Sequence, residues 1–204
     1  MRALAINGSP RKHGNTRLLL EQVLAPLAQA GWETELVQVG GRDLHGCRAC
    51  DLCERNLDLR CGSEDDVFND VFARMLKADA VILGSPTYFA DVSAEMKALV
   101  DRAGYVAMAN RFAMAGKIGA AVVAVRRGGA THAFDTMNHL FFISQMVVPG
   151  STYWNLAIGR EAGEVAGDAE AMRNMHHLGR AIDWLGRAMK ESRVPYPVLQ
   201  TGQA

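Results

Sequence analysis

The four cysteines of this 204-residue chain are crowded into one short segment. Cys47, Cys50 and Cys53 follow one another in a C-x2-C-x2-C pattern, and Cys61 comes after seven further residues. Thiolates spaced this closely can converge on one centre, as they do around [4Fe–4S] clusters. Structural zinc also accepts four cysteines, but commonly as two C-x2-C pairs about 12 or more residues apart. We predict a metal site with a [4Fe–4S] cluster; free or redox-active thiols are the first alternative and zinc is the second. The predicted ligands are Cys47, Cys50, Cys53 and Cys61.

A second group of reactive side chains follows the first apolar run. Residues 7–17 read Asn-Gly-Ser-Pro-Arg-Lys-His-Gly-Asn-Thr-Arg and precede a helical pattern. The N–H groups at a helix N-terminus bind phosphate well, and hydroxyl, amide and cationic side chains add to them. The loop contains neither the G-x-x-x-x-G-K-[ST] motif that binds nucleoside triphosphates nor the G-x-G-x-x-G motif that binds dinucleotides. We predict a phosphate site, with a flexible turn capped by the threonine as the alternative. Its predicted side chains are Ser9, Arg11, Asn15 and Thr16.

The elements that would position these residues alternate along the chain. Apolar runs predict strands over 3–6, 35–39, 80–83, 118–125 and 146–148. Helical periodicity predicts helices over 16–30, 67–76, 93–108, 132–145 and 169–190. This alternation is typical of an α/β domain with a doubly wound parallel sheet and helices on both faces. We predict one domain over residues 1–204, with a cysteine-rich loop at 45–62 and a C-terminal tail at 191–204. Ligands in such sheets bind beyond the carboxyl ends of the strands.

The motifs resemble a known family. Gly8-Ser-Pro-Arg11 followed by Gly14-Asn-Thr16 is similar to the phosphate loop of the NADPH-dependent FMN reductase group. Gly84-Ser-Pro-Thr-Tyr88 is similar to the second flavin loop of that group, and Met96-Lys97 with Asp101-Arg102 resembles the helix that follows. The resemblance extends from residue 1 to about residue 190. It implies a flavodoxin-like fold, a five-stranded sheet of order 2-1-3-4-5, and non-covalently bound FMN.

The same resemblance gives the remaining loops a role. It implies that the second loop contacts the isoalloxazine ring, where backbone and aromatic side chains suit a flat ring system. A third loop, Arg126-Arg-Gly-Gly129, would let backbone pass close to the flavin edge. Loop aromatics that cap the core, and an exposed basic turn, are the alternatives. The predicted residues of the two loops are Pro86, Thr87, Tyr88, Phe89, Arg126, Gly128 and Gly129. The cysteine pattern resembles the iron–sulfur flavoproteins, a branch of the same group.

The composition limits the classes of partner. Lys plus Arg and Asp plus Glu both number 22, so net charge gives no reason to expect nucleic acid or an anionic membrane. The apolar start, Met1–Ile6, is too short for a signal peptide, and no apolar run reaches the roughly 18 residues of a spanning helix. We therefore expect a cytoplasmic protein, where four free thiols favour metal or redox chemistry over disulfides.

Two redox functions and one non-redox function follow from these motifs. The leading prediction is an FMN-dependent oxidoreductase that passes electrons from NAD(P)H to a quinone, flavin or similar acceptor. The alternative is an iron–sulfur flavoprotein that relays electrons between protein partners such as ferredoxin through FMN and a [4Fe–4S] cluster. A regulatory module without redox chemistry is the third. We name no catalytic side chain, because the cofactor carries the chemistry in a flavoenzyme. The resemblance implies a homodimer or homotetramer.

Overall fold

A parallel five-stranded sheet forms the centre of the molecule. The computed structural model describes residues 1–198, and residues 199–204 lie outside the described part. The strands are β1 (Arg2–Asn7), β2 (Glu33–Gln38), β3 (Ala80–Pro86), β4 (Ile118–Val125) and β5 (Leu156–Ile158). They pair in the order β2-β1-β3-β4-β5, and every pair is parallel. The predicted fold class and strand order are confirmed.

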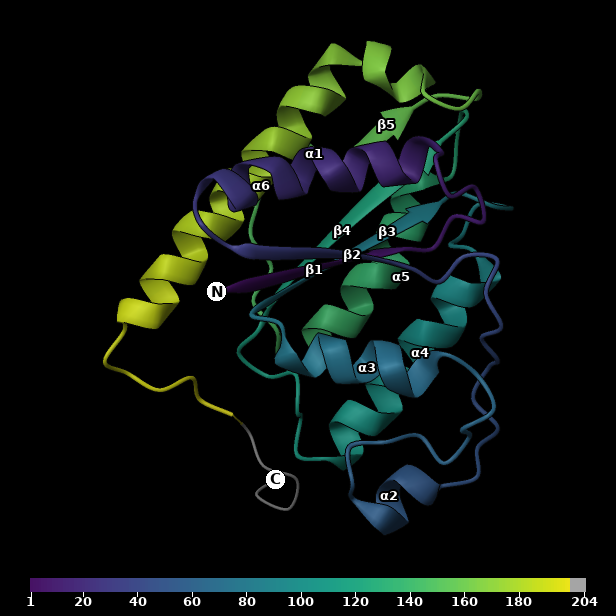
Figure 1. Cartoon of the computed structure of the whole chain (residues 1–204), viewed down its shortest axis with the longest axis vertical. Coiled ribbons are helices and arrows are strands. Elements are labelled where there is room, and N and C mark those ends of the chain that lie inside the picture. Colours follow the sequence, from purple (N-terminus) through teal and green to yellow (C-terminus); the bar gives the residue numbers. More distant parts are fainter. Residues whose placement is uncertain (199–204) are drawn as a thin grey trace.

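Helices cover both faces of the sheet (Figure 1). On one face, α1 (Asn15–Gln29) lies beside α6 (Ala169–Glu191). On the other lie α3 (Phe68–Lys77), α4 (Ala94–Ala109) and α5 (Ala130–Ile143). A short helix, α2 (Leu52–Asn56), stands apart from the sheet near α4, and a 3-10 turn, η1 (Glu164–Gly167), precedes α6.

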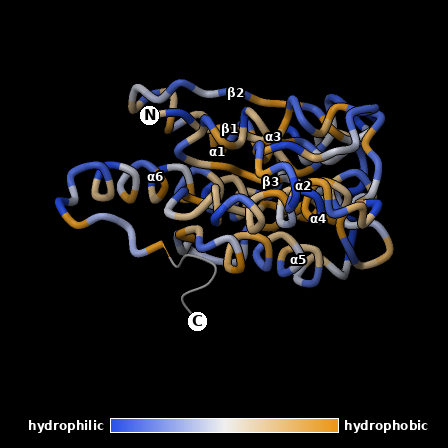
Figure 2. Tube along the Cα trace, turned by 90° about the horizontal axis from the view of Figure 1, so that it is seen from below, coloured by the Kyte–Doolittle hydropathy of each residue, from blue (hydrophilic) through white to orange (hydrophobic). Residues whose placement is uncertain are grey.

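The apolar core is divided into two layers by the sheet. Leu4 and Ile6 of β1 face the layer under α3, α4 and α5, whereas Ala3 and Ala5 face α1 and α6. The central strands β3 and β4 are buried along their whole length, which is why they read as continuous apolar runs. Figure 2 shows hydrophobic segments through the interior and hydrophilic ones along the rim. This rigid sheet holds the loops at its carboxyl edge in place.

The predicted fifth strand at 146–148 is wrong. Val147 makes only an isolated bridge with Ile118, and the fifth strand is β5, at 156–158. Met146 is buried against the core without forming a strand. The apolar run 146–148 therefore indicated burial correctly at Met146 but did not indicate strand pairing. β5 needs little apolar sequence because it is a three-residue edge strand that pairs with Val123–Val125. A buried coil and a short strand have the same composition, which explains the error.

Two further expectations concern the ends of elements and the membrane. The predicted tail at 191–204 begins at the last residue of α6, and its residues 199–204 lie outside the described part.

Within residues 1–198, none of the helices combines the length and the apolar character that crossing a membrane requires.

Candidate functional site: a loop pocket and a four-cysteine pocket

The predicted phosphate and flavin loops meet at the carboxyl edge of the sheet. A pocket of about 340 Å³ lies there, between the loops that follow β1, β3, β4 and β5. Eight predicted site residues line it: Ser9, Arg11, Asn15, Thr16, Pro86, Thr87, Tyr88 and Arg126. Three lining residues were not predicted: Ala124, Gly159 and Arg160. Gly159 and Arg160 directly follow β5, and they were not predicted because the fifth strand was placed at 146–148. The apolar run 156–158 before a glycine was the signal that could have identified them.

The first loop leads into an open helix N-terminus. Gly14 is the N-cap of α1 and supplies no side-chain cap. Thr16 lies inside the helix and is buried, so the prediction that it would be the N-cap in the flexible-turn alternative is wrong. Within residues 1–198, no acceptor pairs with the N–H groups of Asn15, Thr16 and Arg17. Three unpaired donors at the positive end of a helix form a site for an anion.

Side-chain contacts around that helix start hold the loop in one shape. Ser9 is buried, and its Oγ accepts a hydrogen bond from the Arg11 N–H at 3.2 Å. The Asn15 side chain does not extend into the pocket as a free donor. Its Nδ2 donates to the carbonyl oxygens of Gly159 and Glu161, at 3.2 and 2.9 Å. Asn15 therefore joins α1 to the loop after β5, and its backbone N–H is what it offers to a ligand.

The second loop has an unsatisfied group beside the pocket. The Oγ1 of Thr87 is buried and has no hydrogen-bond partner in the described part of the chain. The N–H groups of Thr87 and Tyr88 are paired with the carbonyls of Ala124 and Asp91, at 2.9 and 2.8 Å. An unpaired buried hydroxyl costs about 1–3 kcal/mol, and a polar ligand could satisfy it.

The tip of the second loop is strained and exposed. Phe89 and Ala90 have φ angles of 47° and 66°, a turn geometry that usually takes Asn and Gly. The Phe89 ring is fully exposed and does not line the pocket, unlike its predicted neighbours. Strain of this kind concentrates at ligand-binding loops.

The third loop contributes one arginine and a contact with the second loop. Arg126 lines the pocket, whereas Gly128 and Gly129 do not. Gly129 has a φ of +84°, and a Cβ there would lie 2.7 Å from the Cα of Ala90. The glycine thus lets the third loop pack on the strained turn. Gly128 has open space around it, and no contact explains its presence.

All four cysteines line a second pocket, of about 70 Å³. Arg102, Tyr105 and Val106 of α4 also line it. Each of them is a free thiol. Cys47 and Cys50 are exposed, and Cys53 and Cys61 are half-buried. Within residues 1–198 the side chains do not form a ready set of three or more metal ligands, so the ligand assignment stays a prediction. Burial raises the pKa of the Cys53 thiol.

The backbone of the cysteine segment is curled by residues in the left-handed region. Ala49, Asp51, Leu57 and Leu59 all have φ between 49° and 62°. Each such residue costs roughly 1 kcal/mol or more. The segment is held nonetheless: the Asn69 amide exchanges two hydrogen bonds with the Cys61 backbone, at 2.8 and 2.9 Å. A strained loop fixed from outside keeps its thiols facing one pocket.

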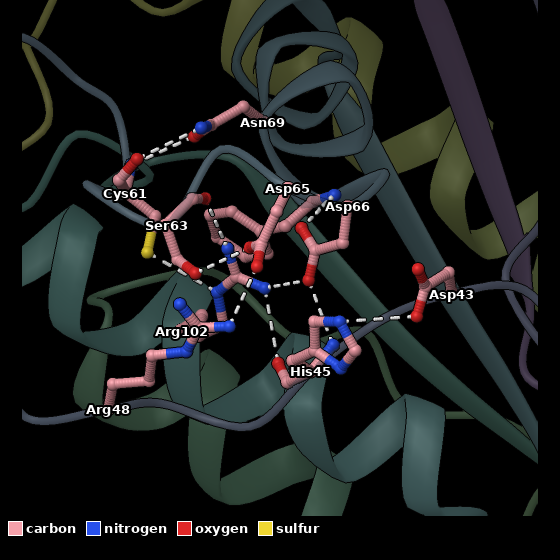
Figure 3. A network of polar contacts seen from close by, with 10 residues as sticks. Asp43, His45, Arg48, Cys61, Ser63, Asp65, Asp66, Asn69 and Arg102 are labelled. Atoms are coloured by element: carbon pink, nitrogen blue, oxygen red, sulfur yellow. Dashed lines mark hydrogen bonds and ion pairs between the residues drawn. The ribbon is translucent and has the colours of Figure 1, made fainter.

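A buried ion pair fixes both ends of that segment (Figure 3). Arg102 of α4 is 1% exposed in its side chain and pairs with Asp66, which is 0% exposed. Its Nη1 also donates to the His45 carbonyl at 3.1 Å, and its Nη2 to the Ser63 carbonyl at 2.9 Å. One guanidinium thereby joins the chain before the first cysteine to the chain after the last.

Comparison with known proteins gives this architecture a family. Residues 1–161 match the family described as NADPH-dependent FMN reductase. An iron–sulfur flavoprotein of Methanocaldococcus jannaschii is 32% identical over 198 residues, which cover 94% of this chain and 100% of the relative. An iron–sulfur flavoprotein of Archaeoglobus fulgidus is 34% identical over 173 residues and 83% of each chain. A solved archaeal flavodoxin has a TM-score of 0.58 at 17% identity, covering 94% of this chain and 100% of that one.

The match to the family spans the loops after β1, β3 and β4, the cysteine segment and the first residues of the loop after β5. The fold, the pocket at its carboxyl edge and the sequence similarity agree with one another. This chain belongs to the NADPH-dependent FMN reductase family and is a flavodoxin-like, FMN-dependent oxidoreductase.

Proposed function

We propose that the chain is an iron–sulfur flavoprotein that couples FMN in the loop pocket to a [4Fe–4S] cluster on Cys47, Cys50, Cys53 and Cys61. The observation that carries this proposal is that all four cysteines of the chain line one pocket. The names of the relatives from M. jannaschii and A. fulgidus support the same combination. Such a protein links two-electron chemistry at the flavin to partners that carry one electron at a time.

The loop pocket fits the chemistry of FMN. A phosphate would be held by the unpaired N–H groups at the start of α1, with Arg11 supplying a positive charge. The buried Oγ1 of Thr87 offers a donor or an acceptor that nothing in the described chain satisfies. Bound FMN supplies hydride acceptance and one-electron transfer, while the loops bind the flavin and fix its orientation.

The cysteine pocket fits a cluster by its set of donors. Four thiols within a span of 15 residues face one cavity, and thiolates are the ligands that iron–sulfur clusters take. The loop's strained backbone and its anchors on Arg102 and Asn69 would hold those ligands in place. A reducing cytoplasm, which we propose as the location, would keep the thiols available.

A second candidate function is a simple NAD(P)H-dependent reductase of a quinone or flavin. The description of the matching family favours this function, because it names NADPH as the donor. Arg126 and Arg160 at the pocket would suit the phosphates of a nicotinamide nucleotide. We propose NAD(P)H as the electron donor of this simple reductase, and a homodimer or homotetramer as the assembly for either function. The two functions differ in whether the acceptor is a small molecule or a one-electron protein partner.

Two reciprocal variants test the proposed function. Ser9→Asp places a carboxylate against the phosphate site, so FMN affinity should fall at least tenfold while iron content is unchanged. Cys50→Ser should abolish cluster absorbance and iron while FMN affinity is unchanged. Each variant is the control for the other, and both are measured by flavin titration and iron assay on anaerobically prepared protein. Full iron in Cys50→Ser, or unchanged FMN affinity in Ser9→Asp, would contradict the corresponding assignment.

The electron donor separates the two candidate functions. Rapid bleaching of the flavin by NADPH or NADH, followed by turnover with a quinone, would support the simple reductase. Reduction by ferredoxin or dithionite, with no bleaching by either nucleotide, would support the relay between protein partners. Stopped-flow absorbance under argon distinguishes these outcomes.

A further inference from the structure

Arg102 directs one donor at a cysteine sulfur. Its Nε lies 3.3 Å from the Sγ of Cys61, within hydrogen-bond range for sulfur. The other two nitrogens of the guanidinium are committed to the loop ends and to Asp66. The plane of the group also lies over the Phe68 ring, with its carbon 4.2 Å from the ring centroid. Figure 3 shows the guanidinium of Arg102 between Asp66 and the Cys61 sulfur.

We propose that Arg102 is a positioning residue for Cys61 that also raises the reduction potential of the cluster. This inference rests on the proposed function, because it needs Cys61 to be a cluster ligand. The anchoring of the loop uses Nη1 and Nη2, whereas the contact with sulfur uses Nε. The sulfur contact is therefore separate from the structural task.

The direction of the effect follows from charge. A cluster gains one negative charge when it is reduced, and hydrogen bonds to its sulfurs stabilise the more negative state. The donor here is a buried cation, so its hydrogen bond is charge-assisted and little screened by water. Asp66 opposes the effect, because its carboxylate pairs with the same guanidinium. The hydrogen bond and the ion pair thus act on the cluster with opposite signs.

This opposition separates a tuning role from a merely structural one. Arg102→Lys keeps the positive charge, but an ammonium group cannot donate hydrogen bonds to the loop carbonyls, to Asp66 and to the Cys61 sulfur at the same time, as the planar guanidinium does. Asp66→Asn keeps the Nε donor and removes the opposing charge. If Arg102 only anchored the loop, Arg102→Lys would leave the cluster potential unchanged in protein that retains iron, because the variant keeps the positive charge. Asp66→Asn shows how far a change of one charge in this network moves the potential.

The experiment is an anaerobic potentiometric titration of the FMN-loaded, iron-loaded protein, with the reduced cluster followed by electron paramagnetic resonance. Arg102→Lys should lower the cluster potential enough to shift the oxidised-to-reduced ratio about tenfold, or about 59 mV for one electron. Asp66→Asn should shift the ratio the opposite way. The flavin potential, read from absorbance in the same samples, should stay constant in both variants.

Each outcome decides the inference. An unchanged cluster potential in Arg102→Lys, or a lowered one in Asp66→Asn, would overturn it. If Arg102→Lys does not retain iron, Asp66→Asn decides alone, and a potential that does not rise would overturn the inference. Wild-type protein without iron would overturn the proposed function as well. Iron-loaded protein whose cluster potential does not respond would overturn this inference only.

Discussion

The Nδ2 of Asn15 donates a hydrogen bond to the carbonyl of Gly159 at 3.2 Å, across 144 positions of sequence. The Oδ1 of the same amide accepts the Gly163 N–H at 2.8 Å. The start of α1 and the loop after β5 are therefore fixed to each other on one side of the loop pocket. The shape of the proposed phosphate site therefore depends on this connection as well as on the residues expected to contact the phosphate.

Asn15→Ala should weaken both the fold and the site. It removes bonds to two carbonyls and one N–H, so we expect a loss of about 1–3 kcal/mol in the free energy of unfolding of the apo protein. FMN affinity should fall as well, because the loop after β5 is no longer held against α1. Urea denaturation and flavin titration measure the two effects. Asn15→Asp, which keeps only the acceptor, should lie between wild type and Ala in stability.

Gly40 is expected to be intolerant of a side chain. A Cβ at this position would lie 2.2 Å from the backbone carbon of Ser9, and backbone cannot move aside cheaply. Gly40→Ala should therefore cost about 1–3 kcal/mol or more and reduce FMN affinity by displacing the phosphate loop. Gly150→Ala is the matched control, since nothing lies within 4 Å of a Cβ there, and its effect should stay within about 0.5 kcal/mol. Equal effects on melting temperature would contradict this account of the loop.

The strained turn at Phe89 and Ala90 allows a test of the second flavin loop. Ala90→Gly and Phe89→Asn should each relieve part of the strain and stabilise the fold by up to about 1 kcal/mol, because Asn and Gly favour positive φ. Only Phe89→Asn removes the exposed ring. If the ring contacts the bound flavin, affinity for FMN falls in Phe89→Asn and is unchanged in Ala90→Gly. Equal affinity in the two variants would exclude Phe89 from the cofactor site.

The buried carboxylate of Asp66 predicts a dependence of stability on pH. Burial raises its pKa, but hydrogen bonds outweigh the burial and hold the pKa below the ordinary value. The main donor is Arg102, and backbone N–H groups add to it. A group whose folded pKa is depressed stabilises the fold above its unfolded pKa of about 3.9, and that stability is lost as pH falls through the folded pKa.

Asp66→Asn should therefore destabilise the apo protein most at neutral pH. We expect a loss of about 3 kcal/mol at pH 7, since one partner of a buried ion pair is removed. The difference from wild type should begin to shrink below about pH 4, where Asp66 takes up a proton in the unfolded wild-type chain, and should continue to shrink as the pH falls through the lower folded pKa. Urea denaturation between pH 3 and pH 7 measures both proteins. A difference that stays constant over this range would show that the charge of Asp66 is not what stabilises the fold.

The sequence was sufficient for the four long strands and for placing the polar loop between β1 and α1, because both depend on local patterns. Buried parallel strands such as β3 and β4 are continuous apolar runs, and the polar loop before α1 carries its own donors. The fifth strand was missed because its only local signal, the three-residue apolar run 156–158, is too short to distinguish an edge strand that pairs with β4 from buried coil. Arg160 was missed for the same reason.

Contacts between distant segments could not be predicted from the sequence. Nothing near Asn15 indicates that its amide binds the loop after β5, and nothing near Arg102 indicates that it lies beside Cys61. Phe89 was predicted to lie in the flavin loop, but only the backbone shows that it stands outside the pocket on a strained turn. These relationships depend on tertiary packing between elements.

The cofactor content of the wild-type protein, purified without oxygen, tests whether the chain holds both FMN and a [4Fe–4S] cluster. An absorbance spectrum is combined with assays of FMN, iron and acid-labile sulfide per chain. We expect flavin bands together with about four irons and four sulfides, the content of one [4Fe–4S] cluster. Flavin without iron would contradict the assignment of the four cysteines and leave a simple FMN-dependent reductase.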